Sequence, residues 1–379
     1  MKVLLVGNYE PDAQQSMQRF GEVLAEKLPQ LEWEIEVVRP RPAWGKLAAR
    51  RGGSVAKWLG YVDKYILFPR ELRRRAAEAA VVHVVDHSNA IYVPRRAHAR
   101  WLVTCHDLLA VRGALGEDTD CPASALGRRL QRAILAGLGR ADGIACDSTS
   151  TFQDLTRLAP QQAGQMRRVI LLGLNHPYRR IEAAEAQARL AALPGIPWNQ
   201  PFWLHVGSNL ARKNKAGVLR VFASASARWP GNLVFCGAEL TAELRAQAVA
   251  AGLAHRVFAV PRPDNPQLEA IYNLAEALIY PSKCEGFGWP VIEAQACGCP
   301  VVCSDRTSLP EIAGEGALVF PVEAEAAMAG ALLQLGAAAF RAEVVAKGLA
   351  NVRRFSTERM IDDYVALYCA ITVSANPSR

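Results

Sequence analysis

The 379-residue sequence lacks the features that define several protein classes. It contains no apolar run near the ~20 residues that a membrane-spanning helix requires. Its nine cysteines form no CxxC pair and no His/Cys cluster with zinc spacing, so we expect reduced, buried thiols and neither a metal nor a redox centre. The opening residues, MKVLLVGNYEPD, have too short an apolar run for a signal peptide and predict a first strand, so we expect a cytoplasmic protein.

The fingerprints of two large enzyme classes and of nucleic-acid binding modules are also absent. Neither GxGxxG nor GxxxxGK[ST] occurs, and no GxSxG follows a strand pattern. A nicotinamide oxidoreductase and a P-loop enzyme are therefore disfavoured. No helix-turn-helix, OB-fold or RNP-like pattern accompanies the net charge of +8, so nucleic acid is not an expected partner.

Positive charge is concentrated in one segment of the first half. Between Arg39 and Arg75 there are eleven Lys and Arg residues and only two acidic residues, with Trp and Tyr interleaved among them. The simple interpretation is a solvated surface. Because Trp and Tyr suit a membrane interface, the alternative is a surface that meets anionic lipid or an anionic acceptor. Peripheral contact of residues 39–75 with the inner face of a membrane is therefore kept as a hypothesis.

Short β-rich runs alternate with helical patterns along both halves of the chain, and the length predicts two domains. The runs are short and apolar without alternation, which is typical of buried parallel strands joined by crossover helices. We therefore predict an α/β protein with two doubly wound, Rossmann-like domains. The expected strands are residues 2–7, 34–39, 80–85, 100–107, 142–148, 202–208, 232–237, 256–261, 276–282, 300–304 and 316–321.

Composition suggests where the domains begin and end. The Ala- and Pro-rich stretch at residues 181–200 is weakly patterned and is the expected linker. Residues 1–180 then form the first domain and residues 201–355 the second. A helix pattern at 358–372 has no strand after it, so residues 356–379 are predicted to be a trailing helix.

The segment CEGFGWPVIEAQACGCPVV, residues 284–302, places two glutamates eight positions apart. It follows the expected strand 276–282, and ligands of doubly wound domains bind at the carboxyl ends of strands. Pro290 suits the first turn of a following helix, whose outward-pointing amides form an anion site. Gly286 and Gly288 allow a close approach of the backbone to a ligand.

The two glutamates suit hydroxyl groups better than they suit a phosphate. Glu293 lies about one turn into the expected helix and leans toward its N-terminus, so it can reach the same cleft as Glu285. Carboxylates accept hydrogen bonds from hydroxyls, and an anion flanked by hydroxyls describes a nucleotide-diphosphate sugar. The alternative is that Glu293 only complements the helix dipole and that Glu285 is solvated, and spacing alone leaves both interpretations open.

The stretch PSKCEGFGWPVIEAQACGCPVVCSD closely resembles the E-x7-E region of the retaining GT-B glycosyltransferases of the large family four. HVGSNLARKN (205–214) and NLVFCG (232–237) extend the resemblance over the second half, and TCHDLLAV (104–111) and ACDSTST (145–151) extend it less closely into the first. The resemblance implies the GT-B architecture, in which two domains face a central cleft and a C-terminal helix crosses back to the first domain.

The resemblance also implies an activity. Members of the family transfer a hexosyl group from a nucleotide-diphosphate sugar, here GDP-mannose or a UDP-hexose, to a hydroxyl of a saccharide or lipid-linked acceptor with retention at the anomeric carbon. No metal and no other cofactor is expected. Since no carboxylate stands out for a double displacement, front-face departure assisted by the leaving phosphate is the preferred hypothesis.

The resemblance assigns roles to individual residues. Glu285 would contact the hydroxyls of the donor sugar, Glu293 would hold the ribose, and Lys213 would neutralise the diphosphate. His106 would lie near the anomeric centre. Ser208 stands where many relatives carry an arginine, so Lys213 and the helix amides would carry more of the charge.

The expected sets are as follows. The catalytic residues are His106, Lys213 and Glu285. The donor-binding residues are Gly207, Ser208, Arg212, Lys213, Val260, Glu285, Gly286, Phe287, Gly288, Trp289 and Glu293. The acceptor-binding residues are Gly7, Asn8, Glu10 and Asp107. Asp107 would position either His106 or the loop that follows it.

Three other functional classes are compatible with parts of the sequence. A non-catalytic nucleotide-sugar-binding protein would keep Glu293 and Lys213 without transfer. A glycan phosphorylase or hydrolase would use the same two-domain frame. A basic membrane or nucleic-acid binding module would leave the pair of carboxylates without a purpose. The nucleotide base of the donor and the identity of the acceptor stay open at this point.

Overall fold

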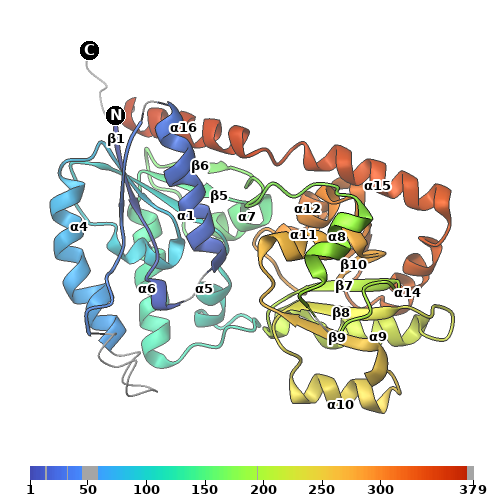
Figure 1. The fold of residues 1–379 in the computed structure, drawn as a ribbon. Coiled ribbons are helices and arrows are strands. Elements are labelled where there is room, and N and C mark those ends of the chain that lie inside the picture. The colour runs from blue at the N-terminus through green and yellow to red at the C-terminus, as the bar shows by residue number, and fades with distance from the viewer. Residues whose placement is uncertain (13–14, 32, 45–58, 194, 374–379) are drawn as a thin grey trace. The chain divides into compact units, whose positions relative to one another are not determined.

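The computed structural model describes residues 1–12, 15–31, 33–44, 59–193 and 195–373. The chain divides into two compact units. Unit 1 comprises Met1–Asn175 and Thr357–Arg379, and unit 2 comprises His176–Ser356. Each unit is a parallel sheet with helices on both faces, so the predicted fold class of two doubly wound domains is confirmed (Figure 1). We describe each unit by itself.

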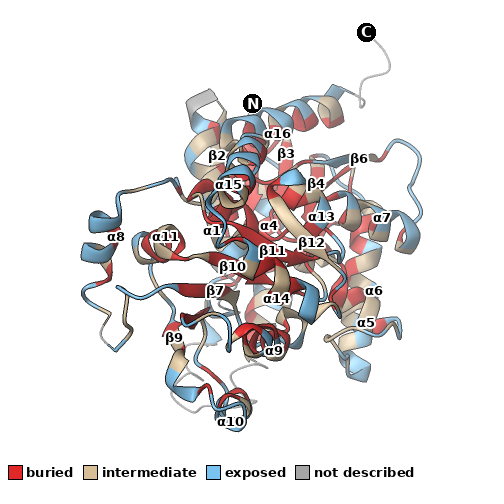
Figure 2. Ribbon diagram, turned by 90° about the vertical axis from the view of Figure 1, so that its right-hand side faces the viewer, coloured by how far each residue is buried: buried red, intermediate tan, exposed pale blue. Residues whose placement is uncertain are grey.

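Unit 1 is built on a six-stranded parallel sheet in the order β2-β1-β3-β4-β5-β6. Its strands are β1 (Lys2–Val6), β2 (Glu34–Val38), β3 (Val81–Val84), β4 (Arg100–Cys105), β5 (Gly143–Cys146) and β6 (Met166–Val169). The inner strands are buried on both faces, as parallel sheets require (Figure 2). The first five strands confirm the sequence predictions. β6 was not predicted, because its sequence MRRV is polar and lies half-exposed at the edge of the sheet.

Helices cover both faces of this sheet. They are η1 (Glu10–Asp12), α1 (Gln15–Lys27), η2 (Leu28–Leu31), η3 (Asp63–Leu67), α4 (Phe68–Ala76), η4 (His87–Tyr92), α5 (Leu109–Ala114), α6 (Ala125–Arg140), α7 (Thr149–Leu158) and α16 (Thr357–Val373). Serine residues define two of the N-termini. Ser124 Oγ accepts a hydrogen bond from Gly127 N at 3.2 Å, and Ser148 Oγ accepts one from Thr151 N at 3.1 Å.

The C-terminal helix α16 completes the core of unit 1. His83 on β3 places its Nδ1 2.8 Å from Tyr368 Oη and its Nε2 2.8 Å from Thr104 Oγ1. Thr104 Oγ1 lies 2.9 Å from Tyr364 Oη, which closes a buried polar network between the helix and the sheet. Burial lowers the pKa of His83 to about 3, so its ring is neutral. The predicted return of the C-terminal helix to the first domain is therefore confirmed.

The two points at which the chain passes between the units lie side by side. Thr357, the first residue of α16, donates a hydrogen bond from Oγ1 to Leu174 O at 3.2 Å. A Cβ atom at Gly173 would lie 2.7 Å from Thr357 Cα, so only glycine fits there. The exit from unit 1 and the return to it are thus packed against each other.

Unit 2 contains a second six-stranded parallel sheet, in the order β12-β11-β10-β7-β8-β9. Its strands are β7 (Phe202–Gly207), β8 (Asn232–Gly237), β9 (Val257–Pro261), β10 (Ala277–Tyr280), β11 (Val301–Ser304) and β12 (Ala317–Phe320). All six strands confirm the sequence predictions. Its helices are α8 (Ala183–Leu190), η5 (Ala211–Lys213), α9 (Lys215–Ala225), α10 (Ala242–Ala250), η6 (Ala254–Arg256), α11 (Asn265–Leu274), α12 (Trp289–Ala296), α13 (Leu309–Ala313), η7 (Gly314–Gly316), α14 (Glu325–Gln334) and α15 (Ala338–Val352).

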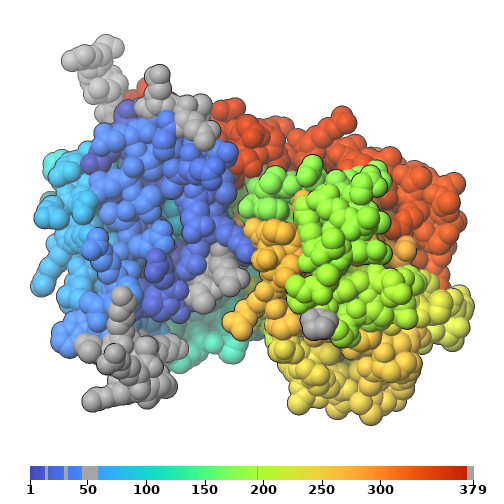
Figure 3. Space-filling model, in the orientation of Figure 1, coloured from blue at the N-terminus to red at the C-terminus, as the bar shows by residue number. Residues whose placement is uncertain are grey.

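The region expected to be the linker contains part of unit 2. Helix α8 packs on α11, and Figure 3 shows its green atoms against the orange atoms of α11 at the surface. Arg189 donates to Glu269 Oε2 at 2.6 Å, and Arg179 N donates to Glu269 Oε1 at 2.9 Å. The chain therefore passes between the units at Asn175–His176, before residues 181–200. The alanine-rich sequence of α8, AAEAQARL, offers too little apolar periodicity to predict a packed helix.

The segment predicted to contact a membrane is described only in part, since residues 45–58 lie outside the described residues. Trp44 and Ile66 are exposed in the described part, with 50% and 56% of their surface accessible. Among the helices of the described ranges, none by itself is both long and apolar enough to cross a bilayer. One pair, Glu325–Gln334 and Ala338–Val373, has the required length and composition when taken together, with a bend of 106°.

Candidate functional site

Two predicted site residues of unit 2, Lys213 and Glu285, meet Tyr280 at the carboxyl ends of β7 and β10. These two strands are adjacent in the sheet. Lys213 Nζ lies 2.7 and 2.9 Å from the two carboxylate oxygens of Glu285. Tyr280 Oη lies 2.8 Å from Glu285 Oε1 and 2.9 Å from Lys213 Nζ. The side chains of Lys213 and Glu285 are only 14% and 8% exposed. This is the switch point of the sheet, where doubly wound folds bind their ligands.

The loop that carries Lys213 is held by its neighbour Asn214. Asn214 has a left-handed backbone conformation, with φ of 52°, and begins α9 by accepting a hydrogen bond from Gly217 N at 3.2 Å. Its Nδ2 donates to Pro281 O at 3.0 Å, and Arg212 O accepts from Lys283 N at 2.7 Å. The loops after β7 and β10 are thereby joined, which fixes Lys213 relative to Glu285.

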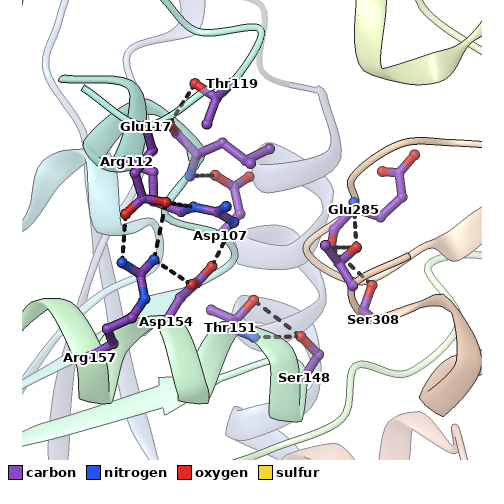
Figure 4. Close-up of polar contacts among 12 residues, drawn as sticks. Asp107, Arg112, Glu117, Thr119, Ser148, Thr151, Asp154, Arg157, Glu285 and Ser308 are labelled. Atoms are coloured by element: carbon purple, nitrogen blue, oxygen red, sulfur yellow. Dashed lines mark hydrogen bonds and ion pairs between the residues drawn. The ribbon is translucent and has the colours of Figure 1, made fainter. Parts of the chain in front are cut away.

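The loop that carries Glu285 is held by residues after the next strand, β11. Thr307 Oγ1 accepts a hydrogen bond from Glu285 N and donates one to Glu285 O, both at 2.9 Å. Ser308 Oγ donates to Phe287 O at 2.7 Å. It also lies 3.0 Å from Glu285 O, the contact drawn in Figure 4. Thr307 has a φ of 51°, which is strained for a β-branched residue and is a feature that clusters at functional sites. The sequence did not single out Thr307 or Ser308, although the adjacency of two parallel strands could have placed them here.

The helix after Glu285 begins as the sequence predicts. Gly288, with φ of 110°, is the residue before α12, and Pro290 lies in the first turn. Phe287 is buried, and its ring packs against Trp289 and Phe355 with centroid distances of 6.1 and 5.8 Å. The amide-rich N-terminus of α12 therefore follows directly on the Lys213–Glu285 pair.

Glu293 lies inside unit 2, one turn further along α12. It is 4% exposed, and its Oε2 accepts a hydrogen bond from Tyr272 Oη on α11 at 2.9 Å. Burial and the carboxylate of Glu293 both raise the pKa of Tyr272, which keeps the phenol protonated and able to donate. Tyr272 was not predicted from the sequence.

The remaining donor-site candidates differ in accessibility. Gly207 ends β7, and Ser208 directly after it is exposed. Val260 lies within β9, where its side chain is 2% exposed and contributes to the core. His205 is a core histidine within the apolar strand β7: its Nδ1 donates to Ile279 O at 2.9 Å, and burial lowers its pKa to about 3.

In unit 1, Asn8 belongs to a buried polar cluster at the carboxyl ends of β1 and β3. Asn8 Nδ2 donates to Asp86 Oδ2 at 2.6 Å, and Asn89 Nδ2 donates to Asn8 Oδ1 at 2.9 Å. Ser88 N donates to Asp86 Oδ1 at 2.9 Å. Burial favours the neutral carboxyl, but the charges of His87 and His106 outweigh it and lower the pKa of Asp86. Asn8 thus holds two loops together.

The other acceptor-site candidates are nearer the surface. Gly7 N donates to Val38 O at 2.8 Å, where β1 and β2 end. Glu10 is exposed, and its Oε1 accepts a hydrogen bond from Arg39 at 2.9 Å. Of this set, the carboxylate of Glu10 is the most accessible to a ligand, with 59% of its side chain exposed.

His106 is held on three sides at the end of β4. Its Nδ1 lies 3.1 Å from Asp147 Oδ2, its Nε2 lies 2.9 Å from Val85 O, and its carbonyl oxygen accepts from Thr151 Oγ1 at 3.2 Å. Asp107 Oδ1 accepts from Leu109 N at 3.0 Å, so Asp107 holds the loop and Asp147 holds the ring. Asp147 lies in the segment ACDSTST but was not selected from the sequence.

The loop after α5 is fastened by a network of ion pairs (Figure 4). Glu117 accepts from Arg112 at 2.7 Å and from Arg157 at 2.6 Å. Asp154 on α7 accepts from Arg112 at 3.0 Å and from Arg157 at 2.9 Å. The connection between α5 and α6 is therefore tied to α7.

A groove of about 790 Å³ lies within unit 1 between residues 61–66 and the start of α6. Tyr61, Tyr65, Leu126 and Leu130 are among its lining side chains. Its volume is in the range of ligand sites, and its lining is mainly apolar with a few polar groups. The sequence did not predict it. Across the described residues, no three His, Cys, Asp or Glu side chains gather in a way that would hold a metal ion.

Residues 189–338 match the family described as glycosyl transferases group 1. The chain is 34% identical over 183 residues to O-antigen chain mannosyltransferase B of Escherichia coli, a match that covers 46% of each chain. It is 29% identical over 300 residues to D-inositol 3-phosphate glycosyltransferase of Acidothermus cellulolyticus, which covers 73% of this chain and 64% of that protein. The chain thus spans about half to two thirds of the length of these curated relatives.

Among solved structures, the chain is similar to Anabaena HepE in complex with UDP and glucose. The TM-score is 0.71 with 16% sequence identity, and the alignment covers 97% of this chain and 99% of that one. A likeness at this identity concerns the fold. Residues 189–338 therefore match the glycosyl transferases group 1 family, and the chain has the GT-B fold.

Proposed function

We propose that this chain is a retaining glycosyltransferase that moves a hexosyl group from a nucleotide-diphosphate sugar to a hydroxyl of a saccharide or lipid-linked acceptor. The observation that carries the proposal is the buried contact between Lys213 and Glu285 at the switch point of the unit 2 sheet. It is supported by the family match over residues 189–338.

The Lys213–Glu285 pair is suited to a ligand that offers both an anion and hydroxyls. Burying two charges costs several kcal/mol of desolvation per ion, and their mutual attraction offsets this only in good geometry. A nucleotide-diphosphate sugar supplies a new partner to each charge. Its diphosphate would take Lys213, and its sugar hydroxyls would donate to Glu285. The ligand would therefore exchange one paired arrangement for another without leaving either charge isolated.

The chemistry follows from the same charges. As the bond between the anomeric carbon and the diphosphate oxygen breaks, negative charge grows on the diphosphate, and Lys213 with the N-terminus of α12 would stabilise it. In the front-face route, the acceptor hydroxyl attacks the side from which the diphosphate departs and gives its proton to the departing phosphate oxygen. These charges make the reaction independent of a metal in this proposal.

The donor is proposed to be GDP-mannose or a UDP-hexose. A mannosyltransferase is among the relatives, which supports the first, and a structural neighbour binds UDP and glucose, which supports the second. Glu293, with its hydrogen bond from Tyr272, is proposed to hold the ribose of either donor.

For the acceptor, the groove of unit 1 supports a partly apolar molecule. Its volume of about 790 Å³ and its Tyr and Leu lining suit the hydrocarbon part of a lipid-linked saccharide.

Contact of the described part of residues 39–75 with anionic membrane belongs to the same proposal. Binding to vesicles with and without anionic lipid tests it, and equal binding to both would contradict it.

The function is tested by thermal shift with GDP, UDP, ADP and dTDP and their hexose conjugates, with and without EDTA. A ligand at ~100 times its Kd adds ~2.7 kcal/mol to the stability of the state that binds it. We expect one base to give a selective shift that EDTA leaves unchanged, and the matching sugar conjugate to be consumed when acceptor is added. Lys283→Met, at an exposed lysine of the neighbouring loop after β10, is the matched control for Lys213→Met. A nucleotide shift without any transfer would favour a binding protein.

A further inference from the structure

Both ring nitrogens of His106 face hydrogen-bond acceptors. Val85 O, 2.9 Å from Nε2, is a carbonyl and only accepts, so Nε2 carries a hydrogen. Asp147 Oδ2 lies 3.1 Å from Nδ1, and this contact also needs a proton between the two atoms. A neutral ring beside a carboxylate would instead oppose a lone pair to a negative charge. The pair therefore contains one proton more than a neutral imidazole and a carboxylate together.

We propose that Asp147 is a positioning residue that holds His106 as an imidazolium with both ring nitrogens engaged. His106 then supplies a fixed positive charge at the carboxyl edge of the unit 1 sheet and does not accept a proton from the acceptor. This inference rests on the proposed function for its catalytic meaning, although its structural part stands without it.

The surroundings of the ring favour the charged form. His106 and Asp147 are 4% and 2% exposed, so water screens their interaction little. Burial alone lowers the pKa of His106, but Asp147 and then Asp86 outweigh it, and the net pKa is raised. Burial raises the pKa of Asp147 to about 6, so near neutral pH its carboxyl is ionised beside the charged ring.

Other titratable groups near this pair do not remove the charge. His83, below it in the sheet, is neutral because burial lowers its pKa to about 3. On the α1 side the ring lies in a T-shaped arrangement with Phe20, at a centroid distance of 5.2 Å. The titratable groups that act on His106 or on Asp147 include Asp86 and His87 after β3, Cys105 on β4, Asp107 after β4, His83 on β3, and Tyr364 on α16.

Asp147→Asn separates the charge from the geometry. The amide of asparagine has nearly the shape of the carboxylate and can donate to Nδ1, so the ring keeps two hydrogen bonds. The ring loses the neighbouring negative charge that stabilises its protonated form. Nitrogen-15 NMR of the full chain with labelled histidine reads the ring directly, and His106→Gln assigns its signals. We expect both ring nitrogens of His106 to be protonated at pH 7 in the wild type and only Nε2 to be protonated in Asp147→Asn. An unprotonated Nδ1 in the wild type would overturn the proposal.

The pH dependence of transfer supplies the catalytic readout. We expect wild-type transfer to fall as pH rises through the raised pKa of His106, and this limb to move down by about one unit or more in Asp147→Asn, as expected on losing a neighbouring charge. At pH 7 the rate should fall by up to ~10-fold for each unit by which the limb moves. Asp362→Asn, on the exposed side of α16, is the control and should change neither reading.

The two readouts separate failure of this inference from failure of the proposed function. A uniform loss of transfer with an unmoved alkaline limb would mean that Asp147 is only structural, which overturns the positioning role. If the chain transfers no sugar, the NMR result still decides whether Asp147 holds His106 in the charged form.

Discussion

The two sheets each reverse their strand order once, and in both a polar pair joins the loops at that point. In unit 1 the reversal lies between β1 and β3, where Asn8 donates to Asp86 at 2.6 Å. In unit 2 it lies between β7 and β10, where Lys213 meets Glu285 at 2.7 Å. One pair combines an amide with a carboxylate, whereas the other combines two opposite charges.

This difference indicates that the pair in unit 1 holds loops together, whereas the charged pair in unit 2 can exchange its internal contact for contacts with a ligand. The Asn8–Asp86 contact is supported by Asn89 and Ser88, so both polar side-chain atoms of Asn8 take part in hydrogen bonds within unit 1. The Lys213–Glu285 pair is bridged by Tyr280 and lies beside the N-terminus of α12, where an anion is favoured. The same place in two related sheets therefore serves packing in one unit and, in our proposal, the donor in the other.

The largest effect on the rate of transfer is expected when the positive charge of Lys213 in unit 2 is removed. Lys213→Met should lower the rate of transfer about 1,000-fold, because one preorganised charge at the leaving group is removed. Asn8→Ala should lower stability but change the rate much less. Steady-state transfer with saturating acceptor measures both variants. An equal loss of rate in the two variants would contradict the distinction between a structural pair in unit 1 and a functional pair in unit 2.

Turning the unit 1 pair into a charged pair should destabilise the protein. In Asn8→Asp a second carboxyl meets Asp86, so one of the two releases its proton only at a higher pH, and its folded-state pKa rises above the unfolded value. A rise of ~2 units costs ~2.7 kcal/mol. With a raised pKa the loss is full at pH 8 and shrinks as pH falls toward the unfolded pKa of ~4. Urea unfolding at pH 5 and pH 8 measures it, with exposed Asn199→Asp as control. A loss that does not change with pH would contradict the like-charge explanation.

A smaller effect, on the affinity for the donor, is expected from the hydrogen bond between Tyr272 and Glu293. Tyr272→Phe removes the hydroxyl that donates to Glu293 at 2.9 Å. Hydrogen bonds to charged groups contribute ~1.5–3 kcal/mol, so we expect donor affinity to fall at least tenfold. Isothermal titration with the donor nucleotide measures the change, and Glu293→Gln should weaken binding in parallel. If only one of the two variants weakens binding, Glu293 does not act through Tyr272.

The smallest effect is expected at the helix that closes unit 1. Tyr368→Phe removes the hydroxyl 2.8 Å from His83 Nδ1 and should cost ~1 kcal/mol of stability. Donor binding to unit 2 should be unchanged. Chemical denaturation and nucleotide titration check the two statements, with exposed Cys369→Ala on the same helix as control. Weaker nucleotide binding in Tyr368→Phe alone would show that the helix affects both units.

Most strands could be predicted from the sequence because buried parallel strands are continuous apolar runs. The runs KVLLV and FWLHVG are examples, and both became strands close to their predicted bounds. β6 and α8 could not be predicted, since MRRV carries two arginines and AAEAQARL is dominated by alanine. Their places depend on neighbours far along the chain, which local pattern does not report.

The candidate site could also be predicted only in part from the sequence. Lys213 and Glu285 follow strands and could be placed on the same edge, and the structure brings them together. The partners that hold them could not be found in this way. Thr307 and Ser308 reach the Glu285 loop because β11 lies beside β10, and Asp147 reaches His106 because β5 lies beside β4. Strand order, which the sequence leaves open, decides these contacts.

The packing of Thr357 against Gly173 has a consequence for the order of events during synthesis. Unit 2 is an insertion whose two ends leave and rejoin unit 1 at one place. Unit 1 therefore lacks Tyr364 and Tyr368 until α16 has been translated, whereas residues 176–356 of unit 2 are translated before it. During synthesis the core of unit 1 therefore cannot be completed before residues 176–356 of unit 2 have been made, and until then His83 lacks its partner on α16.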